Sequence, residues 1–171
     1  MDAAIWTSPG MQAAASARAI LEADLRQGLN RQELRLHYQP VVDESGTAIG
    51  VEALVRWQHP QRGSILPGEF IDLAEKTDLI ISVGQWVLRA ACEQLVIWAA
   101  EPATRDLSIA VNVSVRQFRH PEFVDSVVAC IRNSGVRPHR LKLELTESLL
   151  ADRMEITIEK MGMLKGLGVT L

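Results

Sequence analysis

Cysteine is scarce in this sequence: the 171 residues include only Cys92 and Cys130, and no CxxC motif occurs. Their isolation favours two reduced, buried thiols over a disulfide. A signal peptide is not expected either, because Asp2 follows Met1 and no apolar core comes after it. The most apolar stretch, residues 79–100, is interrupted by polar side chains, which predicts a buried helix rather than a membrane span. We therefore expect a cytoplasmic protein with no membrane span in this chain.

Charge of either sign is not in large excess. The formal net charge is −3, the pI is about 5.8, and the basic residues are scattered along the chain. This balance excludes electrostatic binding of a nucleic-acid polymer by the chain as a whole. With 47% hydrophobic and 23% charged residues, the composition is that of an ordinary soluble globular protein. The length suffices for one domain with its own core.

Residues 51–57, with the sequence VEALVRW, predict a β-strand with two different faces. Every second position carries an apolar side chain, namely Val51, Ala53, Val55 and Trp57. The positions between them carry Glu52, Leu54 and Arg56. An acid and a base on a strand whose opposite face is apolar require water, a ligand or a metal beside them. This strand is therefore the first candidate for part of a functional site.

Residues 34–42 predict a second strand that pairs with the first. Residues 44–46 supply turn chemistry between the two strands, and too few residues intervene for a crossover helix. We therefore expect an antiparallel hairpin. With the turn centred on Ser45 and the following glycine, Gln39 lies opposite Glu52 on the same face, whereas a slip of one residue would reverse the faces.

The remaining segments follow a simple order. Residues 1–12 predict a linker, residues 13–33 an N-terminal helix, and residues 59–68 an irregular loop. Beyond the hairpin, we expect helices over 69–77, 82–100, 121–135 and 154–165, and strands over 108–115, 140–147 and 169–171. This alternation predicts parallel strands joined by right-handed crossovers.

The expected strands share one pattern, in which one parity is apolar and the other is small or polar. This favours a barrel whose outer wall packs on helices. A doubly wound open sheet, the competing fold, would need apolar residues on both parities. The expected fold is therefore α/β, a modified (β/α)₈ barrel of the TIM type with an antiparallel first strand, truncated in its fifth strand.

Glu52, Asn112 and Glu144 each lie on the inward parity of a separate expected strand, near its carboxyl end. In a barrel these ends form the mouth where active sites lie. Two carboxylates and one amide carbonyl are hard oxygen ligands, which suit Mg²⁺ or Mn²⁺ and suit zinc poorly. One such residue alone would be an ordinary solvent-facing side chain, but three at matching positions predict a shared metal site. Arg56, on the same face, is placed to bind a phosphate.

Several motifs, in this order, resemble those of the EAL-domain family: LHYQP at 36–40, Glu52-Ala53-Leu54 within VEALVRW, LPGEFIDLAE at 66–75, VNVSVRQF at 111–118 and LELTES at 143–148. The resemblance implies that residues 34–171 are the N-terminal part of one EAL domain with a modified (β/α)₈ barrel. It also implies hydrolysis of the bacterial second messenger cyclic di-GMP to linear pGpG with Mg²⁺ or Mn²⁺.

Roles for single residues follow from the same resemblance. It implies that Glu52, Asn112 and Glu144 are metal ligands and that Gln39, Leu54 and Arg56 contact the substrate. Glu147 would anchor a loop that orders the site and helps dimerisation, although its position alone also fits a cap of the next segment. The implied partners are cyclic di-GMP, a second copy of the chain, and an upstream sensor or GGDEF-type domain.

The sequence departs from the family pattern at its end. The family's next motif, DDFGTG, would begin beyond Leu171, and a later catalytic lysine and glutamate would follow it. We therefore expect this chain to be inactive alone, as part of a longer protein or as half of a swapped assembly. The alternative function is a degenerate EAL module that binds cyclic di-GMP or a protein partner without catalysis. The retained metal-ligand positions favour the enzyme.

Overall fold

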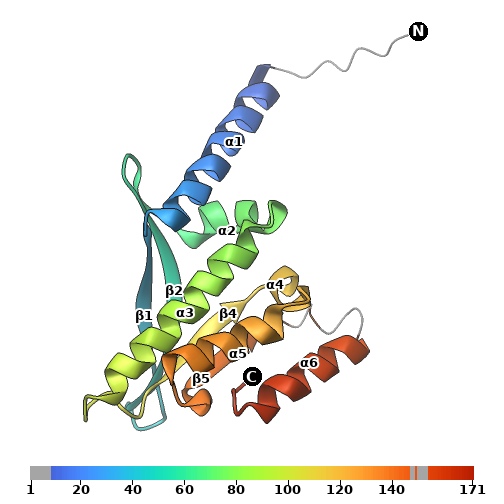
Figure 1. Cartoon of the computed structure of the whole chain (residues 1–171). Coiled ribbons are helices and arrows are strands. Elements are labelled where there is room, and N and C mark those ends of the chain that lie inside the picture. Colours follow the sequence, from blue (N-terminus) through green and yellow to red (C-terminus); the bar gives the residue numbers. More distant parts are fainter. Residues whose placement is uncertain (1–8, 147–148, 150–153) are drawn as a thin grey trace.

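The protein is described by a computed structural model, which places residues 9–146, 149 and 154–171. Its sheet consists of β1 (Leu34–Val42), β2 (Ala48–His59), β3 (Gly63–Ile65), β4 (Ser108–Val113) and β5 (Leu141–Leu145). The strand order is β1-β2-β4-β5, with β3 paired to β2 (Figure 1). β1 runs antiparallel to β2, whereas β2, β4 and β5 run parallel. This arrangement confirms the expected α/β fold with an antiparallel first strand.

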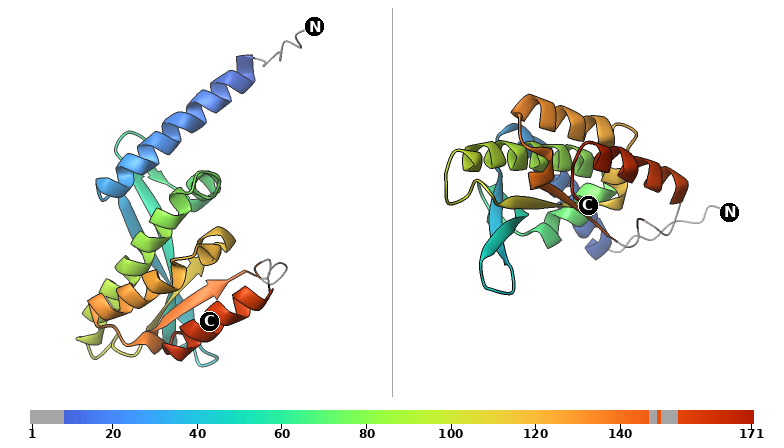
Figure 2. Two further views of the ribbon diagram at one scale, coloured as in Figure 1. Left: turned by 45° about the vertical axis from the view of Figure 1, so that its right-hand side comes forward. Right: turned by 90° about the horizontal axis from the view of Figure 1, so that it is seen from below.

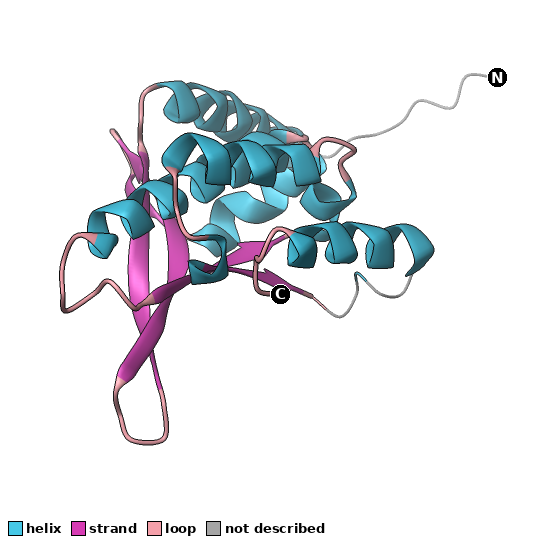
Figure 3. Ribbon diagram, turned by 60° about the horizontal axis from the view of Figure 1, so that its bottom comes forward, coloured by secondary structure: helices cyan, strands magenta, loops and turns pink. Residues whose placement is uncertain are grey.

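Helices cover one face of this sheet (Figures 1 and 3). They are α2 (Pro67–Lys76), α3 (Leu79–Ala99), α4 (Val115–Arg119), α5 (Phe123–Ser134) and α6 (Met154–Gly166), and the 3-10 helix η1 (Pro138–Arg140) leads into β5. The N-terminal half of α1 (Pro9–Asn30) projects away from the rest of the molecule (Figure 2).

The strands contribute one parity of side chains to the core beneath the helices. On β2, Val51, Ala53 and Trp57 are buried, as the alternation predicts. The same parity is buried on the next two strands, with Ile109, Val111 and Val113 on β4 and Leu141 and Leu143 on β5. The side chains of the opposite parity, which include the polar ones, therefore point away from this core and are available to the mouth of the barrel.

α3 is the core helix of the domain. Nine of its residues are buried, and it contacts α2, α5 and β4. By length and composition it is also the one helix of the described residues that could cross a membrane. Cys92, on the buried face of α3, is a free thiol, and the half-buried Cys130 on α5 is free as well. The packing is that of the buried helix predicted from the sequence.

The β1–β2 hairpin has the register predicted from its turn, because Gln39 is the cross-strand partner of Glu52. The Asp43 carboxylate accepts hydrogen bonds from the backbone N–H groups of Ser45 and Thr47, at 2.9 and 3.0 Å. The Ser45 hydroxyl donates to the same carboxylate, and this bond, together with the backbone bonds, holds the pKa of Asp43 below its ordinary value. Gly46 has a φ of +81°, which a glycine adopts without strain.

Several predicted segments are wrong in detail. The expected loop at 59–68 contains β3, because the Nδ1 atom of His59 accepts hydrogen bonds from two backbone N–H groups of the turn that follows and so returns the chain onto β2. The strand expected over 108–115 ends at Val113. There the Ser114 hydroxyl accepts a hydrogen bond from the Gln117 N–H at 3.1 Å and caps α4. α1 also begins earlier than expected, at Pro9.

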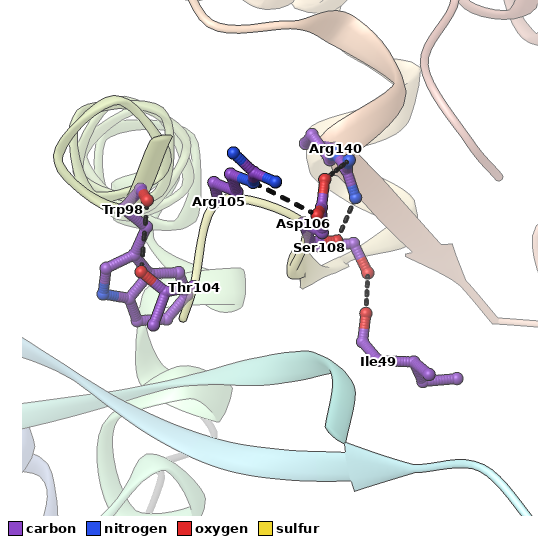
Figure 4. Close-up of polar contacts among 7 residues, drawn as sticks. All are labelled: Ile49, Trp98, Thr104, Arg105, Asp106, Ser108 and Arg140. Carbon is purple, nitrogen blue, oxygen red and sulfur yellow. Dashed lines mark hydrogen bonds and ion pairs between the residues drawn. The ribbon is translucent and has the colours of Figure 1, made fainter. Parts of the chain in front are cut away.

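Polar contacts join the amino ends of the parallel strands (Figure 4). Arg140, just before β5, donates to the backbone carbonyl of Asp106 and also contacts its carboxylate at 2.7 Å. The Ser108 hydroxyl at the start of β4 donates to the Ile49 carbonyl on β2 at 3.4 Å. These contacts lie at the end of the sheet opposite to the carboxyl ends, so they brace the strands without occupying the mouth.

α1 and the loop that joins it to β1 are attached to the carboxyl end of β2 by two polar contacts. The indole Nε1 of the fully buried Trp57 donates to the Glu33 carboxylate at 3.0 Å. The Nε2 atom of His59 lies 3.3 Å from the carboxylate of Asp24, which is on α1. Because Nδ1 of His59 accepts two backbone hydrogen bonds, Nε2 carries the proton and donates to Asp24.

Candidate functional site

The register of the sheet brings the predicted polar residues onto one face. Glu52, Ala110 and Lys142 are successive partners across β2, β4 and β5. Two residues further along, Asn112 and Glu144 are partners across β4 and β5. Side chains two residues apart on a strand share a face, so all five point to the same side of the sheet. This side is opposite to the buried parity that packs under the helices.

The side chains of this face contact one another in two pairs. The Asn112 amide Nδ2 donates to the Glu52 carboxylate at 2.7 Å. The Lys142 ammonium donates to the Glu144 carboxylate at 2.9 Å. Since Asn112 on β4 and Glu144 on β5 are also register partners, the two pairs are adjacent on the sheet. The structure therefore brings together all of the residues predicted as metal ligands, with a lysine that the prediction did not include.

The chemistry of this donor set fits a hard divalent cation. Glu52 and Glu144 offer carboxylate oxygens, and Asn112, which uses its amide nitrogen toward Glu52, keeps its carbonyl oxygen as a further donor. No cluster of three or more His, Cys, Asp or Glu side chains is found among the residues that the structure describes. A metal at this site would therefore depend on an amide ligand, which is typical of Mg²⁺ or Mn²⁺ rather than zinc.

The residues predicted to contact substrate surround this face. Leu54 and Asn112 line a cavity of about 400 Å³ whose other walls are mainly apolar residues of α2 and α3. Gln39 is exposed on β1, directly opposite Glu52. Arg56 donates to the backbone carbonyl of Val55 at 2.9 Å and leaves the rest of its guanidinium for other partners.

One further cation lies beside Arg56. Its cross-strand partner on β1 is Arg35, so the two arginines share one face of the hairpin. One guanidinium nitrogen of Arg35 donates to the backbone carbonyls of Gln32 and Leu34, at 2.5 and 2.7 Å. Like charges directly opposite each other in a sheet repel, and an anion between them relieves the repulsion. The sequence did carry this signal, since Arg35 shares the parity of Gln39, but the pairing with Arg56 depends on the hairpin register.

The cavity of about 400 Å³ also contains an unusual polar group. Gln117 on α4 is 96% buried, and its Nε2 atom has no hydrogen-bond partner among the described residues. Its amide lies against Gly84 of α3, where an added Cβ would approach it to 2.2 Å. A side chain at position 84 would therefore close this end of the cavity.

A second cavity, of about 610 Å³, opens on the other side of the polar face. Asn112, Lys142 and Glu144 line it from the strands, and Met161 and Lys165 line it from α6. Asn112 lines both cavities, and Glu144 lines the larger one. Glu147, the predicted loop anchor, lies outside the described residues.

Comparison of the sequence with known proteins identifies relatives over nearly its whole length. The sequence model of the EAL domain matches residues 22–171. The bifunctional diguanylate cyclase/cyclic di-GMP phosphodiesterase MucR of Pseudomonas aeruginosa is 45% identical over 165 residues, which cover 94% of this chain and 24% of that protein. The oxygen sensor protein DosP of Escherichia coli is 33% identical over 169 residues, covering 96% of this chain and 20% of DosP. The chain therefore spans about a quarter or less of the length of these curated relatives.

Solved structures share the fold. A structure described as the PaMucR phosphodiesterase in complex with c-di-GMP superposes with a TM-score of 0.83 and 46% identity, covering 88% of this chain and 61% of the other. The EAL enzyme Bd1971, in a form with cAMP and cyclic-di-GMP bound, gives a TM-score of 0.83 and 30% identity, with 91% and 43% of the two chains covered. The sequence motifs, the fold and these matches agree, and the chain belongs to the EAL domain family.

Proposed function

We propose that this chain is part of an EAL domain that hydrolyses cyclic di-GMP to linear pGpG with the help of a divalent cation. The observation that carries the proposal is the convergence of Glu52, Asn112 and Glu144 on one face of three adjacent parallel strands. MucR, at 45% identity, carries the name of a cyclic di-GMP phosphodiesterase, and a structure described as its complex with c-di-GMP has the same fold.

Glu52, Asn112 and Glu144 are the residues of this chain that would hold the cation. When bound, a divalent ion would supply a Lewis acid that polarises a phosphoryl oxygen and lowers the pKa of a nearby water. The protein's own contribution is orientation. The hydrogen bond from Asn112 fixes one oxygen of the Glu52 carboxylate, and the paired strands β4 and β5 hold Glu144 beside Asn112.

The same face offers separate places for the parts of a cyclic dinucleotide. Arg56 and Arg35 are cross-strand partners on one face, and their positive charges suit a phosphodiester, which carries a negative charge. Leu54 borders the mainly apolar cavity of about 400 Å³, which suits a flat base. Gln39, exposed opposite Glu52, offers both a donor and an acceptor at the edge of the site.

The proposed activity belongs to the full-length protein. The chain covers 61% of the MucR phosphodiesterase structure, so further catalytic residues are expected outside it. The name of MucR joins a diguanylate cyclase to the phosphodiesterase, which supports the expectation of a GGDEF-type domain in this protein as well. The homodimer and the cytoplasmic location stay predictions.

The test is hydrolysis of cyclic di-GMP by the full-length protein, followed by chromatography of pGpG. Glu52→Gln keeps the shape of the side chain and removes its charge, so we expect a rate loss on the order of a hundredfold or more. Glu44→Gln is the matched control, because Glu44 is exposed in the turn of the same hairpin. Equal rates for the wild type and Glu52→Gln would refute the role given to Glu52.

The alternative of binding without catalysis is separated by calorimetry. The full-length protein is titrated with cyclic di-GMP in Ca²⁺, and the ligand is then incubated with the protein in Mg²⁺. Binding in Ca²⁺ and pGpG formation in Mg²⁺ support the enzyme. Binding in both cations with no product would instead identify a binding module.

A further inference from the structure

We propose that Lys142 is a counter-cation of the metal site. Its ammonium pairs with the Glu144 carboxylate when no metal is bound, and it competes with the divalent ion for that carboxylate. The proposal deepens the proposed function and rests on the metal site assigned there. It concerns a residue of this chain that is neither a ligand candidate nor a substrate contact. Its consequence is that Lys142 sets the concentration of divalent cation that the site requires.

The register of the sheet places the lysine where a cation of the site must be. Lys142 lies on the same strand and the same face as Glu144, two residues away, and its ammonium donates to the Glu144 carboxylate at 2.9 Å. It is also in the same cross-strand row as Glu52, with only Ala110 between them. The single methyl group of Ala110 leaves the space between the Lys142 and Glu52 side chains unfilled by that strand.

The charges of the face explain why a cation is needed there. Glu52 on β2 and Glu144 on β5 are two carboxylates on the same side of the sheet, separated by β4, and in the absence of a metal their charges repel. Asn112 relieves Glu52 by a neutral amide, whereas Glu144 receives a full positive charge from Lys142. A divalent ion that binds Glu144 must displace this ammonium or accept it as a neighbour, and either event weakens metal binding.

The position of Lys142 differs from that of an ordinary surface lysine. Its side chain and that of Glu144 are 44% and 36% exposed, so both are partly withdrawn from water. Lys165 offers an internal comparison, because it lines the same cavity of about 610 Å³ from α6. No ion pair joins Lys165 to a carboxylate in the part of the chain that the structure describes.

The test is a calorimetric titration of the full-length protein with Mn²⁺, without cyclic di-GMP. Lys142→Met keeps the length of the side chain and removes the charge, so we expect Mn²⁺ to bind about three- to tenfold more tightly. Lys142→Arg restores the charge and should bind Mn²⁺ within about twofold of the wild type. Lys165→Met is the control for a lost charge in the same cavity and should leave the affinity unchanged. Lys142→Gln serves as a second neutral variant if Lys142→Met does not fold.

The outcomes separate this inference from the proposed function. If the wild type binds Mn²⁺, Glu144→Gln weakens binding and neutral variants at Lys142 strengthen it, both are supported. If Glu144→Gln weakens binding but the neutral Lys142 variants bind as the wild type or more weakly, the counter-cation is overturned and the metal site stands. If the wild type does not bind Mn²⁺, or Glu144→Gln leaves binding unchanged, both are overturned.

Discussion

The hydrogen bond between Asn112 and Glu52 gives the sharpest prediction for the site, through the substitution Asn112→Asp. The wild-type amide donates to the Glu52 carboxylate at 2.7 Å. Asn112→Asp hardly changes the size and shape of the side chain, but it replaces the hydrogen-bond donor by a second carboxylate. An attractive contact thus becomes a repulsive one, and a divalent cation between the two carboxylates would reverse the repulsion.

The magnitude follows from the contact and its exposure. The Asn112 side chain is exposed, so the lost hydrogen bond and the new repulsion are each screened by water. We expect the variant to lose about 1–2 kcal/mol of stability without metal. For a domain of this size, this corresponds to a melting temperature lower by about 2–8 °C. With added Mg²⁺, the extra carboxylate should increase the rise in melting temperature above that of the wild type.

The assay is thermal unfolding at pH 7 in EDTA and in a series of Mg²⁺ concentrations. Asn133→Asp makes the same chemical change on an exposed residue of α5 and should behave as the wild type at every concentration. The metal site would be refuted if Mg²⁺ raised the melting temperatures of Asn112→Asp and the wild type equally. An unchanged melting temperature in EDTA would contradict the contact with Glu52.

Three further predictions concern the scaffold. Gly28→Ala would put a Cβ 2.8 Å from the indole nitrogen of Trp57, so it should lower the free energy of unfolding, measured in urea, by about 1–3 kcal/mol. Gly162→Ala, whose Cβ would have nothing within 4 Å, should raise the free energy of unfolding by up to about 1 kcal/mol. Burial raises the pKa of Cys92 from 9.0 to about 12, so the contribution of its protonated thiol to stability is intact below pH 9 and is lost as the pH rises toward 12. The free energy of unfolding measured in urea should fall by about 1.4 kcal/mol per pH unit above 9, and by less in Cys92→Ala. Lys160, whose pKa is lowered by burial, donates to two carbonyls at and beyond the end of α4, so Lys160→Met should lower the melting temperature.

The hairpin and the polar face could be predicted because local chemistry specifies them. The turn residues at 44–46 fix the pairing of the strands beside them, and the pairing fixes which side chains share a face. Strict alternation of apolar and polar residues then separates the core from the site on every strand. Gln39 opposite Glu52, and the shared face of Asn112 and Glu144, follow from these two rules alone.

The features that were missed depend on contacts between distant segments or between side chains. β3 forms because the buried ring of His59 accepts two backbone hydrogen bonds, and the burial of His59 depends on α1. Lys142 has the same alternating pattern as Glu144, but its row with Glu52 is set by the alignment of β4 with its neighbours. The cavity at Gln117 arises where α3 approaches α4 at a glycine.

The alternation that builds the site also makes it depend on residues far from the chemistry. Each strand carries core and site residues in turn, so a slip of one position on β2 would bury Glu52 and expose Val51. The register of β2 is held at the hairpin turn by Asp43 and at its carboxyl end by the contact of Trp57 with Glu33. Glu52 lies between these two anchors. The position of the carboxylate is therefore specified by a turn and by a contact with the loop between α1 and β1, and neither of them binds metal or substrate.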